Sequence, residues 1–176
     1  MQAIGDENNP DLSPLQRRKL KAAVGFGALV TQHSEAPIVD APQTIANFLM
    51  DKIGWQSQEH CAVVALHCTN RIISWRILSI GSLTETFIPT SELLYFLVQC
   101  KASRAILAHN HPSGSTSPSQ GDLDTTTSAL EALGLLNIQL LDHLVLSRGH
   151  YSSIRAHAPQ LFESTQAAPV PQSKIA

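Results

Sequence analysis

The segment LAHNHPSGSTSPSQGDLD, residues 107–124, joins the end of an apolar run to the start of a polar run with helical character. Alternate residues of a β-strand point to the same face, so His109 and His111 would turn their imidazoles towards one point while Asn110 faces away. The prolines and glycine that follow favour turns, which can bring the chain back past the histidines. The segment therefore predicts a strand, a turn-rich loop and a helix, in that order.

The start of the predicted helix carries two further polar residues, Ser119 and Asp122. Ser119 has the chemistry of a helix N-cap, and Asp122 then falls at N3, where a capping box returns the acidic side chain to the backbone N–H of the cap. In the alternative interpretation, His109, His111 and Asp122 supply two nitrogen ligands and one carboxylate to zinc and leave a fourth position for water. The two interpretations are compatible, because Ser119 can begin the helix while Asp122 faces the histidines.

Strand and helix patterns alternate on both sides of this segment. Apolar runs predict two strands within residues 59–81, with a turn at 68–70, and further strands at 104–109, 137–147 and 150–155. Apolar residues at helical spacing predict helices within residues 13–27, 40–55, 90–103 and 119–136. We therefore predict an α/β fold, with a single mixed β-sheet flanked by helices.

Two of these helices have a predicted buried face. In the helix within residues 40–55, the apolar face consists of Ile45, Phe48, Leu49 and Ile53. In the helix within residues 90–103, Thr90 or Ser91 is the predicted N-cap. Its predicted buried stripe consists of Leu93, Leu94, Leu97 and Val98.

Composition excludes several classes of protein. The 176 residues carry a net charge of −2, so the chain lacks the basic surface expected of a nucleic-acid-binding protein, and the basic run at residues 17–21 is interpreted as a solvated helix face. No apolar run reaches the length of about 20 residues that a membrane helix needs, and the polar, acidic N-terminus is unlike a secretory signal. The three cysteines form no disulfide or zinc-binding pattern, so we expect Cys61 and Cys100 in the core and a cytoplasmic protein.

Three parts of the chain differ in character. We expect residues 1–37 to form a flexible lead with one short helix, and residues 38–157 to form the folded domain. Residues 158–176 are rich in Pro, Gln, Ala and Ser, a composition typical of a disordered tail.

The spacing of the polar residues resembles a known signature. His109-x-His111, seven residues, Ser119, two residues and Asp122 match the H-x-H-x7-S-x2-D pattern of the JAMM (MPN+) metalloproteases. The fuller text AHNHPSGSTSPSQGD, with LLDHLVLS downstream, resembles the RadC branch of that superfamily over residues 38–155. The resemblance implies a cytidine-deaminase-like architecture and one zinc ion per chain, held by His109, His111 and Asp122. It also implies that Ser119 helps to bind the tetrahedral intermediate.

The family pattern requires an upstream glutamate that accepts the proton of the attacking water and passes it to the leaving amine. The segment QEHCAVVALHCTNRII, residues 58–73, resembles the RadC segment that carries this residue, and the resemblance assigns the role to Glu59. Glu85 is the reserve candidate, and Glu35 and Glu92 also lie upstream. Without the resemblance, Glu59 is interpreted as a solvated charge at the start of a strand.

The resemblance implies a zinc-dependent metallopeptidase or isopeptidase that acts on a peptide or protein, with residues 38–157 as its catalytic domain. One alternative is a metal-dependent nuclease or accessory protein of DNA repair, although the residues before the domain are too few for the helix-hairpin-helix module of longer RadC proteins. A second alternative is a non-catalytic MPN interaction module. For His143, inside a predicted apolar strand, a hydrogen-bonded core position and a role beside the metal ligands both stay open.

Overall fold

The computed structural model describes residues 36–81 and 88–165. The helix expected at 13–27, Glu35, Glu85 and the tail beyond residue 165 lie outside these residues. In chain order, the elements are α2 (Pro42–Leu49), the π-helical turn η2 (Met50–Gly54), β1 (Glu59–Leu66), β2 (Ile72–Gly81), α3 (Thr90–Gln99), β3 (Arg104–Asn110), α4 (Gln120–Gly134), β4 (Gln139–Ser147), β5 (His150–Ser153), α5 (Ile154–His157) and α6 (Pro159–Thr165). None of these helices is long and apolar enough to cross a membrane.

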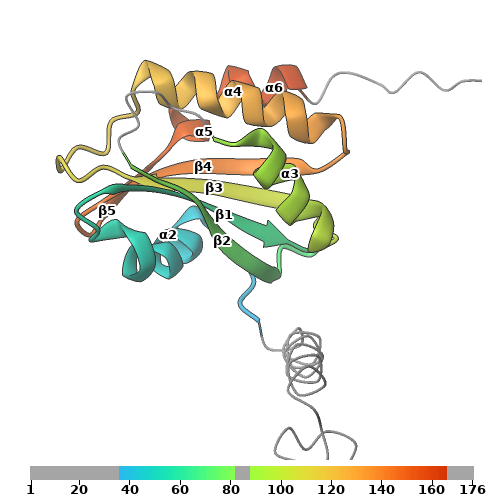
Figure 1. The fold of residues 1–176 in the computed structure, drawn as a ribbon, viewed down its shortest axis with the longest axis horizontal. Coiled ribbons are helices and arrows are strands. Elements are labelled where there is room, and N and C mark those ends of the chain that lie inside the picture. The colour runs from blue at the N-terminus through green and yellow to red at the C-terminus, as the bar shows by residue number, and fades with distance from the viewer. Residues whose placement is uncertain (1–35, 82–87, 166–176) are drawn as a thin grey trace, which may run out of the picture. The chain divides into compact units, whose positions relative to one another are not determined.

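The five strands form one sheet in the order β2-β1-β3-β4-β5 (Figure 1). Strands β3 and β4 run parallel, and every other neighbouring pair is antiparallel. Parallel neighbours need a crossover connection, which the loop after β3 and helix α4 provide. The single mixed sheet with its helices confirms the predicted α/β class.

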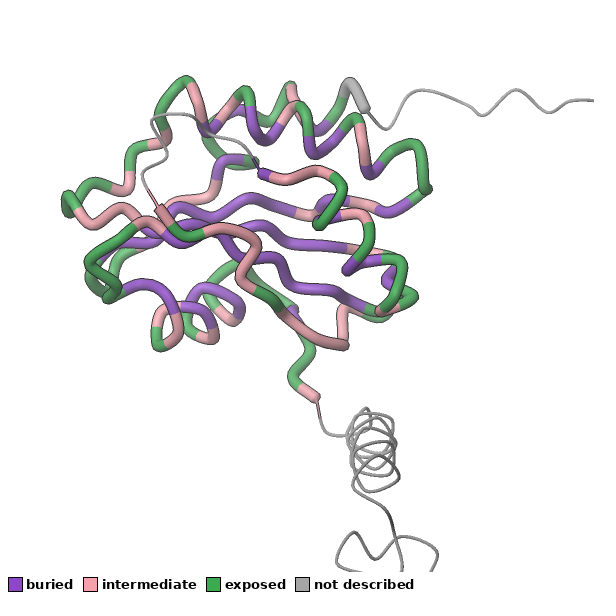
Figure 2. Tube along the Cα trace, viewed as in Figure 1, coloured by how far each residue is buried: buried purple, intermediate pink, exposed green. Residues whose placement is uncertain are grey.

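Helices cover both faces of the sheet, with α3, α4 and α6 on one side and α2 on the other (Figure 1). Successive residues of a strand point to opposite faces, so Leu107 of β3 packs in one apolar cluster with Leu97 and Leu133, while its neighbour Ile106 packs in the other. The central strands β1 and β3 are buried along nearly their whole length (Figure 2). Polar side chains at the end of β3 therefore lie at the edge of an apolar interior.

The helix predicted within residues 40–55 is present and begins at Pro42, a residue that suits the first turn. Ile45, Leu49 and Ile53 are fully buried, as predicted, and Phe48 lies half-buried. The α-helix gives way to the π-helical turn η2 after Leu49, and this turn carries Ile53 into the same cluster. The predicted apolar face is thus confirmed for three of its four residues and in part for the fourth.

The start of helix α3 differs from the prediction. Pro89 occupies the N-cap position, and no side-chain hydrogen bond caps the helix. The prediction of Thr90 or Ser91 as the N-cap is therefore wrong. Proline can precede a helix because the first N–H groups lack partners within the helix in any case.

The buried face of α3 also differs in part from the prediction. Leu93 and Leu97 are buried as expected and Leu94 is half-buried, but Phe96 is buried in place of Val98, which is 55% exposed. Positions 93, 96 and 97 follow the i, i+3, i+4 spacing of one helix face, whereas position 98 lies one step further round the helix.

The chain after residue 157 does not begin as a disordered tail. Residues 159–165 form helix α6, and Phe162 is 2% exposed in the cluster that also contains Leu130 and Leu133 of α4. The guanidinium of Arg155 lies 5.5 Å from the centre of the Phe162 ring. The expectation of disorder from residue 158 is corrected for α6, because one aromatic side chain completes the core and outweighs the polar composition around it.

The three cysteines are free. Cys61 is buried in the cluster beneath α3 and α4, which confirms the expected core position. Cys100 is half-buried against the same cluster, and Cys68 is exposed in the turn between β1 and β2.

Candidate metal centre

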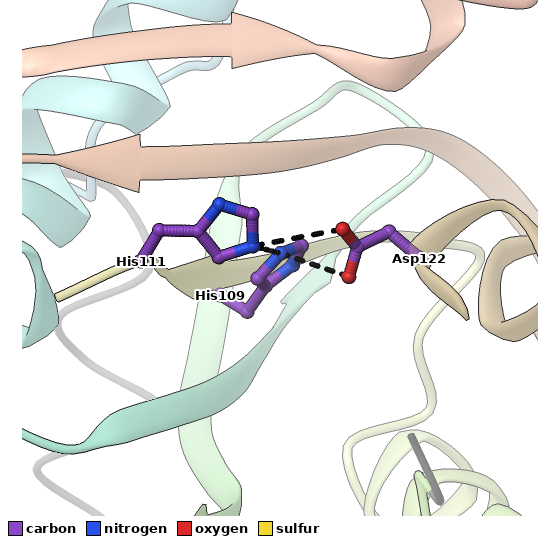
Figure 3. A group of neighbouring side chains, drawn as sticks. All are labelled: His109, His111 and Asp122. Carbon is purple, nitrogen blue, oxygen red and sulfur yellow. Dashed lines mark hydrogen bonds and ion pairs between the residues drawn. The ribbon is translucent and has the colours of Figure 1, made fainter. Parts of the chain in front are cut away.

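Two histidines and an aspartate meet where β3 ends and α4 begins. His109 is the penultimate residue of β3, His111 follows it by two positions, and Asp122 lies in the first turn of α4. The Nε2 atoms of the two histidines are 3.0 Å apart. The carboxylate oxygens of Asp122 lie 3.1 Å from His109 Nε2 and 3.6 Å from His111 Nε2 (Figure 3). The structure thus brings together the three side chains that the sequence analysis expects as ligands.

The backbone of His111 is held in place by strand β4, although His111 lies just past the end of β3. Its N–H donates to the carbonyl of Leu146 at 2.8 Å, and its carbonyl accepts from the hydroxyl of Ser147 at 2.7 Å. Ser147 is fully buried. These two bonds extend the β3–β4 pairing by one residue, so the backbone of His111 is tied to β4 like that of β3.

Ser119 and Asp122 form the predicted capping box. The Ser119 hydroxyl oxygen accepts from Asp122 N–H at 3.3 Å, and Asp122 Oδ2 accepts from Ser119 N–H at 2.7 Å. The Ser119 hydroxyl also lies 2.7 Å from Asp122 Oδ2 and donates to it. Asp122 Oδ1 is the oxygen nearest His109, so one carboxylate caps the helix and faces the histidines at once.

The electrostatics of the cluster favour an anionic Asp122. Burial of its carboxyl acts to raise the pKa, but the hydrogen bonds to His109 and His111 outweigh burial, and the pKa lies well below its ordinary value. Hydrogen bonding to Asp122 in turn raises the pKa of His111, and the charge of Glu59 contributes in the same direction. The carboxylates therefore favour a cation, whether proton or metal, in the space between these side chains.

The donor atoms match the geometry of a four-coordinate metal. Ligand bonds of about 2.0–2.1 Å in a tetrahedral centre place neighbouring donor atoms about 3.3 Å apart. The three separations of 3.0, 3.1 and 3.6 Å lie on either side of that value, and one donor atom from each side chain lies within 4.8 Å of the others. His111 Nδ1 lies 3.1 Å from the carbonyl of Ser115, which can only accept, so a neutral His111 turns its Nε2 lone pair towards the cluster. The residues present therefore fit a metal ion with nitrogen and oxygen ligands.

The sequence pattern of the RadC-like JAB domain matches residues 39–159, a range that contains the whole cluster. The chain belongs to the RadC-like JAB domain family. Family membership confirms the resemblance that the H-x-H-x7-S-x2-D spacing indicates.

Curated relatives of this RadC-like JAB domain carry the name UPF0758. UPF0758 protein tlr1707 of Thermosynechococcus vestitus is 40% identical over 152 residues, which cover 85% of this chain and 61% of the relative. UPF0758 protein sll0766 of Synechocystis sp. is 38% identical over 148 residues, which cover 83% of this chain and 61% of the relative. The chain thus spans about three fifths of the length of these relatives, and their names state no activity.

In this RadC-like JAB domain, Glu59 is the first residue of β1 and is half-buried. Cys61, two residues on, is the β1 partner of His109, so Glu59 lies on the same face of the sheet as the cluster. Glu59 also borders an open pocket of ≈ 390 Å³, whose other lining residues are Ser57, Gln58, Gly81, Pro112 and Ser113. Glu59 therefore lies on the face of the sheet that carries the cluster, but it is not one of the three residues whose donor atoms meet there.

Asn110, between the two histidines, faces away from the cluster as expected. Its side chain forms hydrogen bonds to the start of β1 that the sequence did not indicate. Its side chain is fully buried and accepts from the N–H of His60 at 2.7 Å. Its amide nitrogen donates to the carbonyls of Gln56 and Gln58, at 3.2 and 3.0 Å. These three bonds hold both sides of Glu59 against β3.

His143 lies directly behind His109. Its ring is 1% exposed, with Nε2 2.9 Å from His109 Nδ1 and Nδ1 2.7 Å from the hydroxyl of Thr126. Burial of the ring, and secondly the charge of His109, hold the pKa of His143 well below its ordinary value. Both interpretations of His143 hold, since it is a hydrogen-bonded core histidine that also contacts a candidate ligand. Thr126 was missed, and in sequence it is one of three consecutive threonines with nothing to distinguish it.

Proposed function

We propose that this RadC-like JAB domain is a zinc-dependent hydrolase of the metallopeptidase or isopeptidase type, which cleaves an amide bond in a peptide or protein. The observation that carries the proposal is the meeting of His109 Nε2, His111 Nε2 and the Asp122 carboxylate within 4.8 Å. Two imidazoles and one carboxylate leave a fourth position open in a tetrahedral centre, and that composition is typical of catalytic zinc sites.

The donor set favours zinc over the hard divalent cations. Magnesium and calcium prefer oxygen ligands only, whereas two of the three donors here are imidazole nitrogens. Zinc, when bound, supplies Lewis acidity that polarises a carbonyl and makes water a nucleophile near neutral pH. His109, His111 and Asp122 would hold it. The free cysteines suit a reducing compartment, so we place the activity in the cytoplasm.

Glu59 is the proposed general base. Glu59 borders an open pocket that Pro112, the residue after His111, also lines, and the charge of Glu59 acts on His111. A carboxylate in this position accepts the proton of the attacking water and passes it to the leaving amine. The pocket next to Glu59 is where the leaving group of the substrate would lie.

Ser119 is proposed to support the oxyanion that develops on the substrate carbonyl. Its hydroxyl is 2.7 Å from Asp122 Oδ2 and donates to it in the free protein. To serve the substrate, the hydroxyl turns from that oxygen towards the oxyanion, while Asp122 Oδ2 keeps the N–H of Ser119 as a donor.

Cleavage of a peptide library by the zinc-loaded chain tests this function. We expect cleavage by the wild-type chain and a loss of roughly 10²- to 10⁴-fold in Glu59→Gln, because the amide cannot accept the proton. Glu131→Gln is the matched control, since Glu131 is an exposed carboxylate in the last turn of α4, at the opposite end of the helix from Asp122. Full activity in Glu59→Gln would show that Glu59 is not the base. Zinc binding without cleavage of any peptide would instead favour a non-catalytic interaction module.

A further inference from the structure

A chain of buried hydrogen bonds runs from His109 back to the ligand helix. His109 Nδ1 lies 2.9 Å from His143 Nε2, His143 Nδ1 lies 2.7 Å from Thr126 Oγ1, and Thr126 Oγ1 donates to the backbone carbonyl of Asp122 at 2.6 Å. All four residues are at most 1% exposed. The chain joins β3, β4 and α4, and it begins and ends at candidate metal ligands.

Each bond in this chain has a fixed direction. The carbonyl of Asp122 can only accept, so it takes the single hydroxyl proton of Thr126. Thr126 Oγ1 must then accept from His143, which places the ring proton of His143 on Nδ1 and a lone pair on Nε2. His109 therefore carries its own proton on Nδ1, and Nε2 is the ring nitrogen left to face His111 and Asp122. Reversal of the last bond would put a proton on both nitrogens of His143, and neither hydrogen-bond partner of that ring is an anion.

Core packing alone does not account for these polar side chains. Residue 143 pairs with Leu107 in the sheet and stands between Asp142 and Leu144 of β4. An apolar side chain could fill the same space without the desolvation of an imidazole and a hydroxyl, which is costly unless both are fully hydrogen-bonded. What an apolar residue could not do is accept the Nδ1 proton of His109.

The two histidine ligands are oriented by different means. His111 Nδ1 is 3.1 Å from the backbone carbonyl of Ser115, a partner that no side-chain substitution removes. The orientation of His109 depends on side chains alone, His143 directly and Thr126 behind it. Of these two outer hydrogen bonds, the one to His109 is therefore the one that a substitution of its partner removes.

We propose that His143 and Thr126 are positioning residues that hold His109 in the tautomer with a bare Nε2, and so set the affinity of the centre for zinc. The proposal rests on the metal site of the proposed function and does not depend on hydrolysis. Loss of such an outer hydrogen-bonding partner typically weakens metal binding by roughly 10- to 100-fold.

Zinc affinity, measured on the full chain by competition with a chromophoric chelator, tests the proposal. We expect Thr126→Val to bind zinc roughly 10- to 100-fold more weakly than the wild type, and Thr126→Ser, which keeps the hydroxyl, to restore most of the affinity. Thr127→Val is the matched control. Thr127 Oγ1 donates to the carbonyl of Leu123 at 2.9 Å, so that variant loses the same kind of helix bond next door without a histidine partner.

If Thr126→Val does not fold, a second pair of variants, at position 143, tests the same proposal. Gln at position 143 can accept with its oxygen and donate with its amide nitrogen, so we expect His143→Gln to bind zinc more tightly than His143→Leu. The ¹⁵N shifts of the zinc-free chain give an independent readout, with His109 in the Nδ1–H form in the wild type and in a mixture of forms in Thr126→Val.

The outcomes separate this proposal from the function on which it rests. If Thr126→Val binds zinc as tightly as the wild type does, and His109 keeps the same tautomer in both, the positioning role alone is overturned. A wild-type chain that binds no zinc would contradict the metal site and the positioning role together. An equal weakening in Thr127→Val would mean that the helix bond, and not the contact with His143, matters, which also overturns the proposal.

Discussion

Asp122 uses its two carboxylate oxygens for two purposes. Oδ1 lies nearest His109, whereas Oδ2 accepts from the N–H and hydroxyl of Ser119 and also lies 3.6 Å from His111 Nε2. A substitution of Asp122 therefore acts on the helix start and on the cluster together. Asparagine keeps one oxygen and the size of the side chain, so Asp122→Asn removes the charge with the least damage to the cap.

Cys61 lies beneath the cluster, opposite His109 in the neighbouring strand. Burial, and secondly the charge of Asp122, raise the pKa of its thiol to about 12, so almost no reactive thiolate exists near neutral pH. We expect a disulfide reagent at pH about 8 to modify exposed Cys68 at once and Cys61 only after unfolding, because the reactive species is the thiolate and burial keeps the Cys61 thiol protonated. Mass spectrometry of digested, labelled protein measures both sites. Native labelling of Cys61 as fast as Cys68 would contradict the buried position.

At the scale of elements, the site depends on where one strand stops and one helix starts. Strand β3 and its pairing with β4 fix both histidines, and the capping box fixes the first turn of α4 that carries Asp122. Asn110 adds a link from β3 to the start of β1, beside Glu59. The elements are far apart in sequence, but rigid pairing keeps the side chains within hydrogen-bond distance.

The helix cap and the proposed chemistry of Ser119 can be separated by two substitutions. Ser119→Ala should lower the free energy of unfolding by about 1 kcal/mol, because the N–H of Asp122 loses its acceptor. Ser119→Asn should retain that free energy, since asparagine is an equally good cap, but it lacks the hydroxyl. Urea unfolding measures the first effect, and peptide cleavage by Ser119→Asn measures the second. Wild-type cleavage by Ser119→Asn would restrict Ser119 to capping.

At the scale of the whole molecule, helix α6 belongs to the core. Phe162→Ala should lower the free energy of unfolding by roughly 3–5 kcal/mol, because a fully buried aromatic side chain is replaced by a cavity. Leu135→Ala, at a position that is 84% exposed, is the control and should change it by less than about 0.5 kcal/mol. Denaturant unfolding of the zinc-free chain gives both values. A Phe162→Ala variant as stable as the control would show that α6 is detached in solution.

Local patterns in the sequence predict most of this fold. Apolar runs and helical spacing are properties of neighbouring residues, so the five strands and the helices α2, α3 and α4 could be located from them. The strand predicted at 150–155 is too long, because its last two residues begin helix α5. The failures at α3 and α6 have another origin. Phe96 rather than Val98 is buried, and Phe162 orders a polar segment, because each fits a space that only the assembled core creates.

The candidate site likewise contains residues that a local sequence pattern predicts and contacts that no local pattern predicts. His109, His111 and Asp122 lie within one short segment whose spacing is readable, and the structure brings them together. His143 and Thr126 are 17 residues apart, and Asn110 reaches back 54 residues to Gln56, so neither set of contacts leaves a local pattern. Family resemblance could indicate Glu59, but the bonds that hold its segment are visible only in three dimensions.

The zinc content of the purified chain tests the central claim most directly. After removal of metal, incubation with zinc and dialysis, we expect one zinc ion per chain in the wild type and almost none in Asp122→Asn. Asp124→Asn is the matched control, because Asp124 is an exposed acid just after the first turn of α4, and its carboxylate contacts only Gln120 among the bonds described for its side chain. Full zinc content in Asp124→Asn would complete the predicted result. An Asp122→Asn variant that keeps its zinc, or a wild-type chain that takes up none, would contradict the assignment of this cluster as a metal centre.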